Sequence, residues 1–101
     1  MTLTKLVLVC PQALADAVVD FLLESERDSR GFITVPAAAH EADFTHASLR
    51  EKVRGSIDAV LVILVLPATE VAPLLESMRG KFHSAQIHYW TEPVQEMGDL
   101  S

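Results

Sequence analysis

The segment IDAVLVILVL, residues 57–66, decides the fold that this sequence predicts. From Ala59 onward both alternating sets of positions are apolar, and Pro67 closes the segment. A strand with one face in water alternates apolar and polar residues, so this pattern predicts a strand that is buried on both faces. When helices cover one face of its sheet, the other face needs a cover from outside the domain. We therefore expect the chain to self-associate.

Upstream of this strand, the sequence predicts two more strands and one helix. Residues 3–10 are apolar and β-rich, which predicts a first strand. Apolar residues at i, i+4, i+7 and i+8 within residues 14–22 predict a helix. Residues 32–35 predict a short second strand, which Pro36 closes. Residues 37–55 show no clear period and predict a long loop, a feature typical of functional segments.

Downstream, residues 69–79 predict a second helix with Gly80 as its stop, and residues 85–91 predict a last strand. Pro93 and a polar tail, Gln95–Ser101, follow. The order β-α-β-β-α-β predicts an α+β, ferredoxin-like fold, in which a four-stranded antiparallel sheet carries both helices on one face. Residues 1–101 form a single domain under this prediction.

Composition limits the partners and the compartment. The 101 residues carry 14 acidic and 8 basic side chains, for a formal net charge of −6 at pH 7, which argues against sequence-independent nucleic-acid binding. One cysteine excludes an intramolecular disulfide and a zinc site built on two cysteines of one chain. The apolar runs are too short for a secretory signal or a membrane span, so we expect a soluble, cytoplasmic protein.

The order of the elements, the long loop between the second and third strands and the ending QIHYWTEPV at residues 86–94 resemble the PII-like superfamily. That superfamily comprises trimeric ferredoxin-like proteins, among them the nitrogen-signalling PII proteins and the divalent-ion-tolerance CutA proteins. More narrowly, the chain resembles a small bacterial PII-like family of uncharacterised function. The narrower resemblance is carried by Gly31-Phe32, Val35-Pro36-Ala37, a histidine-bearing loop and His88-Tyr89-Trp90 before Pro93-Val94.

The resemblance implies a homotrimer with small ligands in clefts between subunits and a mobile loop that signals to a partner. Relatives of the narrower family are associated with heavy-metal efflux, so the resemblance also implies a membrane transporter or another regulated protein as the partner of residues 37–55. The chain departs from PII proteins at Gly98-Asp99-Leu100-Ser101, which holds one glycine and no lysine. That departure argues against adenine-nucleotide binding of the PII type. The absence of tyrosine from residues 37–55 excludes uridylylation of a loop tyrosine.

Two histidines and two carboxylates of the predicted loop are candidate metal ligands: His40, His46, Glu41 and Asp43. Neutral imidazole binds zinc, copper and nickel, and carboxylates add negative charge to such a site. Three copies around an axis would multiply the ligands for a divalent transition metal. Because the spacing H-x5-H matches no fixed metal motif, two solvated loop histidines are the alternative.

Arg50, Lys52 and Arg54 form a basic cluster in an acidic chain. Paired cations hold phosphate and other anions, so these three residues are candidate anion ligands. The alternation with Glu51 also fits a solvated helical turn, and the sequence has no glycine-rich phosphate loop.

His88, Trp90 and Glu92 share one face of the predicted last strand, with Tyr89 opposite. Aromatic residues at a strand end line ligand clefts or oligomer contacts, so we assign His88 and Trp90 to an interface or cleft, with simple packing as the alternative. Cys10 precedes a predicted helix, where a thiol can become reactive, but its apolar neighbours favour a buried, inert thiol.

The sequence contains no recognisable catalytic motif. We therefore expect a non-enzymatic sensor, which binds a small ligand or a metal and changes the conformation of residues 37–55. Two alternatives stay open. One is a small enzyme that uses His88 or His40 as a general base in a cleft between subunits. The other is an adaptor that docks through residues 93–101.

Overall fold

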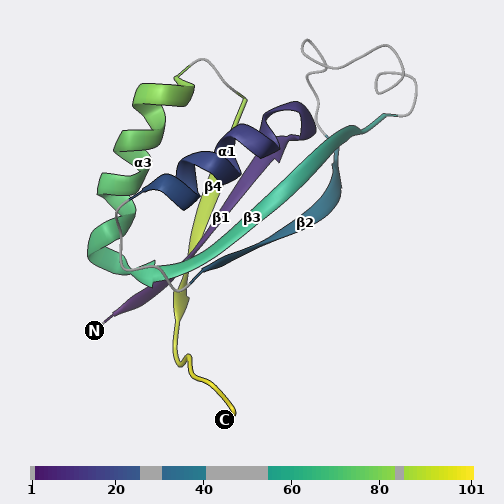
Figure 1. The fold of residues 1–101 in the computed structure, drawn as a ribbon. Helices are drawn as coiled ribbons and strands as arrows, with labels where there is room; N and C mark the ends of the chain where they lie inside the picture. Colours follow the sequence, from purple (N-terminus) through teal and green to yellow (C-terminus); the bar gives the residue numbers. More distant parts are fainter. Residues whose placement is uncertain (1, 26–30, 41–54, 84–85) are drawn as a thin grey trace.

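The computed structural model describes residues 2–25, 31–40, 55–83 and 86–101 (Figure 1). Its elements are, in chain order, strand β1 (Leu3–Pro11), helix α1 (Gln12–Glu24), strand β2 (Phe32–Ala39), strand β3 (Ile57–Pro67), helix α3 (Ala68–Phe82) and strand β4 (His88–Val94). Both helices lie on the same face of the sheet (Figure 1). The predicted β-α-β-β-α-β order and ferredoxin-like architecture are confirmed.

The four strands are arranged in the order β2-β3-β1-β4, and every neighbouring pair is antiparallel. The apolar segment that decides the fold is therefore a central strand, paired with β1 on one side and β2 on the other. In the register of β1 and β3, Leu6 lies opposite Leu64 and Val7 opposite Ile63. The two outer strands, β2 and β4, are the edges of the sheet.

The core lies between the helices and one face of β1 and β3. Its strand residues alternate along the chain, as the pleat requires. The core residues are Leu6, Leu8, Cys10, Val62, Leu64 and Leu66 of the strands, Val18 and Leu22 of α1, and Leu74, Leu75 and Met78 of α3. The rings of Phe21 and Phe82 join the two helices in an edge-to-face contact, with centroids 5.8 Å apart.

Strand β2 corrects the predicted boundary at Pro36. The strand runs through this proline to Ala39, and its last pair with β3 joins Ala39 to Ile57. Because β2 is an edge strand, only one side of its backbone pairs, and a proline is tolerated where a central strand would lose a ladder hydrogen bond. The predicted loop therefore starts after Ala39 rather than at residue 37, and residues 41–54 of it lie outside the described residues.

The C-terminal boundaries also differ from the prediction. Helix α3 does not stop at Gly80 but continues to Phe82, whose ring packs on Phe21 of the other helix, so tertiary packing extends the helix past a weak helix former. Strand β4 begins at His88 and includes Pro93, which is again compatible with an edge strand. The tail thus begins after Val94. Among the described residues, no helix combines the length and apolar character needed to cross a membrane.

Candidate functional site

The face of the sheet opposite the helices, which we call the open face, carries cross-strand rows of side chains, and three of these rows form the candidate site. Register places the rows in line across neighbouring strands. Written from β2 or β3 toward β4, the rows are Val35-Leu61-Val9-His88, Ile33-Ile63-Val7-Trp90 and Val65-Lys5-Glu92. Ile33, Val35 and Trp90 are 61%, 39% and 46% exposed, respectively. The chain by itself thus leaves an apolar surface in water, as the pattern of residues 57–66 predicts.

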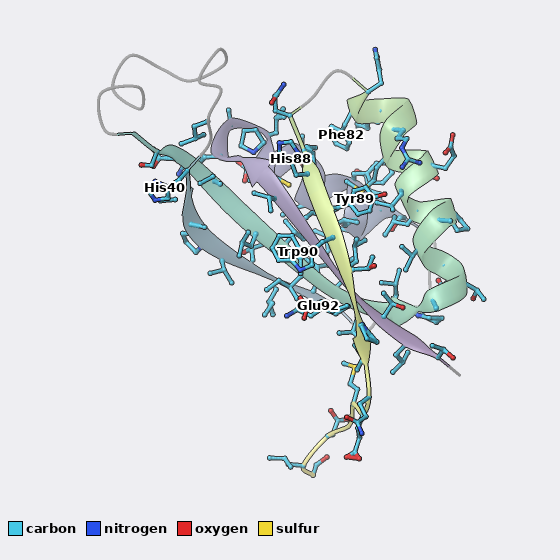
Figure 2. The ribbon with its side chains drawn as sticks, turned by 180° about the vertical axis from the view of Figure 1, so that it is seen from behind. His40, Phe82, His88, Tyr89, Trp90 and Glu92 are labelled. Atoms are coloured by element: carbon cyan, nitrogen blue, oxygen red, sulfur yellow. The ribbon has the colours of Figure 1, made fainter. Side chains whose placement is uncertain are left out.

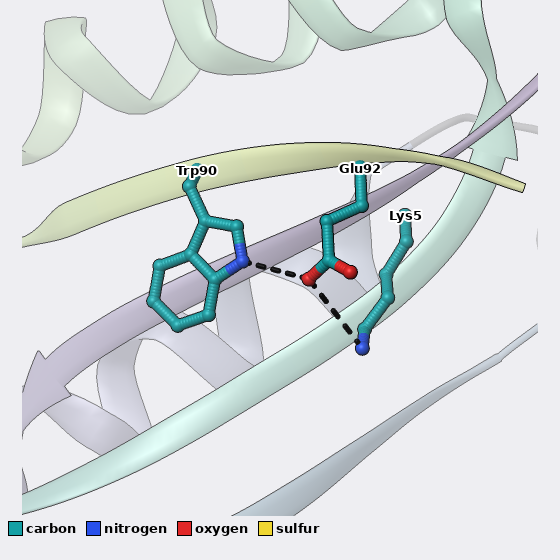
Figure 3. Close-up of polar contacts among 3 residues, drawn as sticks. All are labelled: Lys5, Trp90 and Glu92. Atoms are coloured by element: carbon teal, nitrogen blue, oxygen red, sulfur yellow. Dashed lines mark hydrogen bonds and ion pairs between the residues drawn. The ribbon is translucent and has the colours of Figure 1, made fainter.

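Trp90, Glu92 and Lys5 form a polar contact at the β4 side of the open face (Figure 3). The indole Nε1 of Trp90 donates a hydrogen bond of 2.8 Å to Oε2 of Glu92, and the same oxygen lies 3.7 Å from Nζ of Lys5. The indole lies across β1, and Val7, its register partner, is only 1% exposed (Figure 3). The same carboxylate oxygen thus accepts the hydrogen bond that orients the indole and forms the ion pair with the lysine.

The predicted grouping of His88, Trp90 and Glu92 on one face of β4 agrees with their register opposite alternate residues of β1. Tyr89 lies on the side of β4 toward α3, and Trp90 lies on the other side (Figure 2). Lys5 is not among the predicted site residues. It is a lone cation within an apolar strand, and only the register of β1 and β4 shows that it faces Glu92.

His40 stands at the end of β2, where residues 41–54 leave the sheet (Figure 2). Its Nδ1 lies 3.2 Å from the carbonyl oxygen of Gly55. A carbonyl oxygen can only accept, so Nδ1 is the donor in this contact, and in a neutral ring the lone pair then lies on Nε2. The contact joins the two residues on either side of residues 41–54, and in a neutral ring it favours the tautomer that metal-ligating histidines use when a backbone carbonyl orients them.

The other loop candidates lie outside the described residues: Glu41, Asp43, His46, Arg50, Lys52 and Arg54. In the part of the chain that the structure describes, no three His, Cys, Asp or Glu residues form a group suited to a metal ion. His40 follows β2 and His88 begins β4, which are the two edge strands of the sheet.

Cys10 belongs to the core and is 0% exposed. Burial raises the pKa of its thiol to about 11. At neutral pH the sulfur is therefore protonated and shielded, and it is neither a nucleophile nor a ready metal ligand. The burial expected of this thiol is confirmed.

Solved structures with the same fold include relatives of known family. A DUF3240 family protein from Shewanella baltica OS155 superposes with a TM-score of 0.81 at 24% identity, covering 100% of this chain and 99% of the other. CPII from Thiomonas intermedia K12, a nitrogen regulatory PII-like protein bound to ADP, AMP and bicarbonate, gives 0.71 at 18% identity, covering 99% and 98%. A PII-like signalling protein from Thermus thermophilus, described as putative, gives 0.64 at 15% identity, covering 93% and 87%.

At these identities the solved structures show a shared fold, and the predicted resemblance to PII-like proteins is confirmed at that level. No curated protein matches the chain. The sequence itself matches, over residues 1–101, the family described as "Protein of unknown function (DUF3240)". The chain therefore belongs to the DUF3240 family.

Proposed function

We propose that this protein is a homotrimeric, PII-like sensor of the cytoplasm, which binds a small ligand or a divalent transition metal and passes the signal on through residues 37–55. The observation that carries the proposal is the open face. Two of its rows are apolar from β2 to β1, and Ile33, Val35 and Trp90 remain substantially exposed in the single chain. A soluble signalling subunit with such a face is stabilised by packing it against further copies.

The solved structures support a regulatory role that depends on a small ligand. The Thiomonas protein is described as a nitrogen regulatory PII-like protein and carries ADP, AMP and bicarbonate, and the Thermus protein is described as a PII-like signalling protein. These descriptions supply the ligand classes to test here, namely adenine nucleotides and small anions. Arg50, Lys52 and Arg54 are the proposed anion ligands, and His88 and Trp90 are the proposed lining of an intersubunit cleft.

The alternative ligand is zinc, copper or nickel, held by His40 and His46 with help from Glu41 and Asp43. The contact of His40 Nδ1 with the Gly55 carbonyl supports this assignment, because it directs Nε2 away from the backbone as the ligand atom. A metal bound there would couple the end of β2 to residues 41–54. The partner that reads this change is a membrane transporter or another regulated protein, and a link to heavy-metal efflux would follow.

Native mass spectrometry tests the proposal on the full chain, alone and with Zn²⁺, Cu²⁺, Ni²⁺, ADP, AMP or bicarbonate. The expected apo species has the mass of three 11.1-kDa chains. In the metal arm, uptake occurs in multiples of three and disappears in the His40→Ala/His46→Ala variant. His83→Ala is the matched control, since it removes an exposed histidine at the end of α3, and it keeps metal uptake. A monomer that binds none of these ligands contradicts the proposal.

A further inference from the structure

Strand β4 offers one edge to further strand pairing. It is the last strand in the order β2-β3-β1-β4, and β1 is its neighbour on the other side. Residues 88–93 of β4 are exposed. A sheet edge of this kind presents backbone donors and acceptors to any extended segment that lies beside it.

Apolar surface flanks this edge on the helix side of the sheet. On the helix side, Tyr89 is 48% exposed and lies over a groove between α3 and β4. The groove is lined by Leu75, Met78, Arg79, Phe82, Ile87 and Tyr89, and it continues along Thr4, Val71 and Thr91. On the open face, Trp90 is 46% exposed, but its indole lies over β1 and points away from this edge (Figure 3). An added strand would therefore find its apolar contacts on the helix side, at Tyr89 and the groove.

The C-terminal tail has the length and pattern of such a strand. Residues 95–101 have no helix or strand structure, every one of them is exposed, and the tail leads away from the sheet (Figure 1). Met97 and Leu100 are 46% and 108% exposed, although both are apolar. Their odd spacing sends them to opposite faces of an extended chain, which matches an edge with one aromatic residue on each face. The seven residues of β4 and the seven of the tail are equal in number.

Charge and geometry favour the tail of a second copy over other occupants. The tail contains Glu96 and Asp99 and no cation, whereas Arg79 lines the groove. Arg79 pairs with Glu76 of its own helix at 3.2 Å, but both side chains are mostly exposed, so this pair is weak and easily exchanged. To pair with its own β4 the tail would have to reverse in a turn of at least about two residues, which shortens the strand available.

We infer that residues 95–101 of one copy add as a strand to the β4 edge of a neighbouring copy, with Met97 beside Tyr89 and Leu100 on the side of Trp90. The contact is head-to-tail, and in the proposed homotrimer three such contacts would close into a ring. The inference rests on the self-association in the proposed function and names a second contact besides the open face. It assigns a role to the two exposed apolar residues of the tail.

Disulfide trapping tests the contact directly. Thr91→Cys places a thiol on the Tyr89 side of the edge, and Gln95→Cys or Asp99→Cys places one on the Met97 side of the tail. Cys10 can stay, because it is 0% exposed. After mild oxidation, at least one of the two double variants is expected to give covalent multimers on a non-reducing gel. The control, Thr91→Cys/Ser77→Cys, places its second thiol on α3 and is expected to run as a single chain on the same non-reducing gel. Covalent monomers with an internal disulfide, or no cross-link in either double variant, overturn the inference.

Dilution of tail variants separates this inference from the proposed function. Deletion of residues 95–101, and Met97→Ser/Leu100→Ser in the full chain, are expected to dissociate at a concentration at least about tenfold higher than wild type. Gln95→Ser is the control and keeps the wild-type midpoint. Unchanged midpoints in both tail variants, with an intact oligomer, overturn the tail contact and leave the proposed function standing. A wild-type chain that is monomeric throughout overturns the self-association on which both rest.

Discussion

Replacing Ile33 with Asp probes the open face directly. Ile33 is 61% exposed on β2 and lies opposite the half-buried Ile63 in the register. Leu23 supplies the matched control, since it is also a large apolar residue, is 69% exposed, and belongs to α1 on the other side of the molecule. The two substitutions introduce the same charge, and they differ in the surface that they alter.

The expected magnitude follows from the exposed fraction. Full burial of an isoleucine side chain is worth about 1.5–3 kcal/mol, so covering the exposed 61% of Ile33 contributes roughly 1–2 kcal/mol per copy to assembly. That free energy corresponds to about a 5- to 30-fold change in the association constant for each copy. Asp adds the penalty of burying a carboxylate, which makes the low end of this range a minimum.

Size-exclusion chromatography with light scattering, run over a dilution series, measures the midpoint of dissociation for both variants. We expect Ile33→Asp to raise the protein concentration at that midpoint by at least about fivefold and Leu23→Asp to leave it at the wild-type value. Circular dichroism checks that both variants remain folded. Equal midpoints for the folded variants would refute the conclusion that the open face is buried between copies.

Three further predictions concern the single chain. Burial raises the pKa of the Cys10 thiol to about 11 from an ordinary value of 9.0, so the unfolded chain loses its thiol proton first and the free energy of unfolding falls between those values as pH rises. Urea titrations at about pH 8 and about pH 10 measure this fall in the free energy of unfolding. The fall should be smaller for Cys10→Ala than for wild type, and identical falls would contradict the burial of this thiol. Leu64→Ala, at a core position 1% exposed, should lower the free energy of unfolding in urea by about 2–5 kcal/mol, and a loss below about 1 kcal/mol would be incompatible with its place in the core. Glu92→Gln removes the ion pair with Lys5, whose side chains are 37% and 48% exposed for Lys5 and Glu92, so the free energy of unfolding should change by less than about 1 kcal/mol; a loss above about 2 kcal/mol would show a stronger pair.

Most of the element order was predictable because it depends on local composition. The apolar runs of β1 and β3 and the helical stripe of α1 lie where the sequence predicts them. The predicted ends at Pro36 and Gly80 were wrong. Pro36 is tolerated because β2 lies at the edge of the sheet, and Gly80 stays helical because Phe82 contacts Phe21 on the other helix. Both facts involve partners that are distant in the sequence.

The candidate site was predictable only where it follows from strand periodicity. The spacing of His88, Trp90 and Glu92 places them on one face of β4, and register confirms this. The involvement of Lys5 and the contact of His40 with Gly55 were not predictable, because each joins residues that only the folded sheet brings together. The roles assigned to His46, Arg50 and the other residues of 41–54 stay predictions.

The sequence by itself determined that residues 57–66 form a strand apolar on both faces, since a side-chain period of two leaves no polar side for water. It therefore also predicted that one face of this sheet is apolar and without helix cover, and the burial of that face between copies stays a prediction. Only the tertiary structure decided which residues share that face and that β2 and β4 are the edges of the sheet. The physical reason is that strand order and register depend on pairing between distant segments, and local propensity does not encode that pairing.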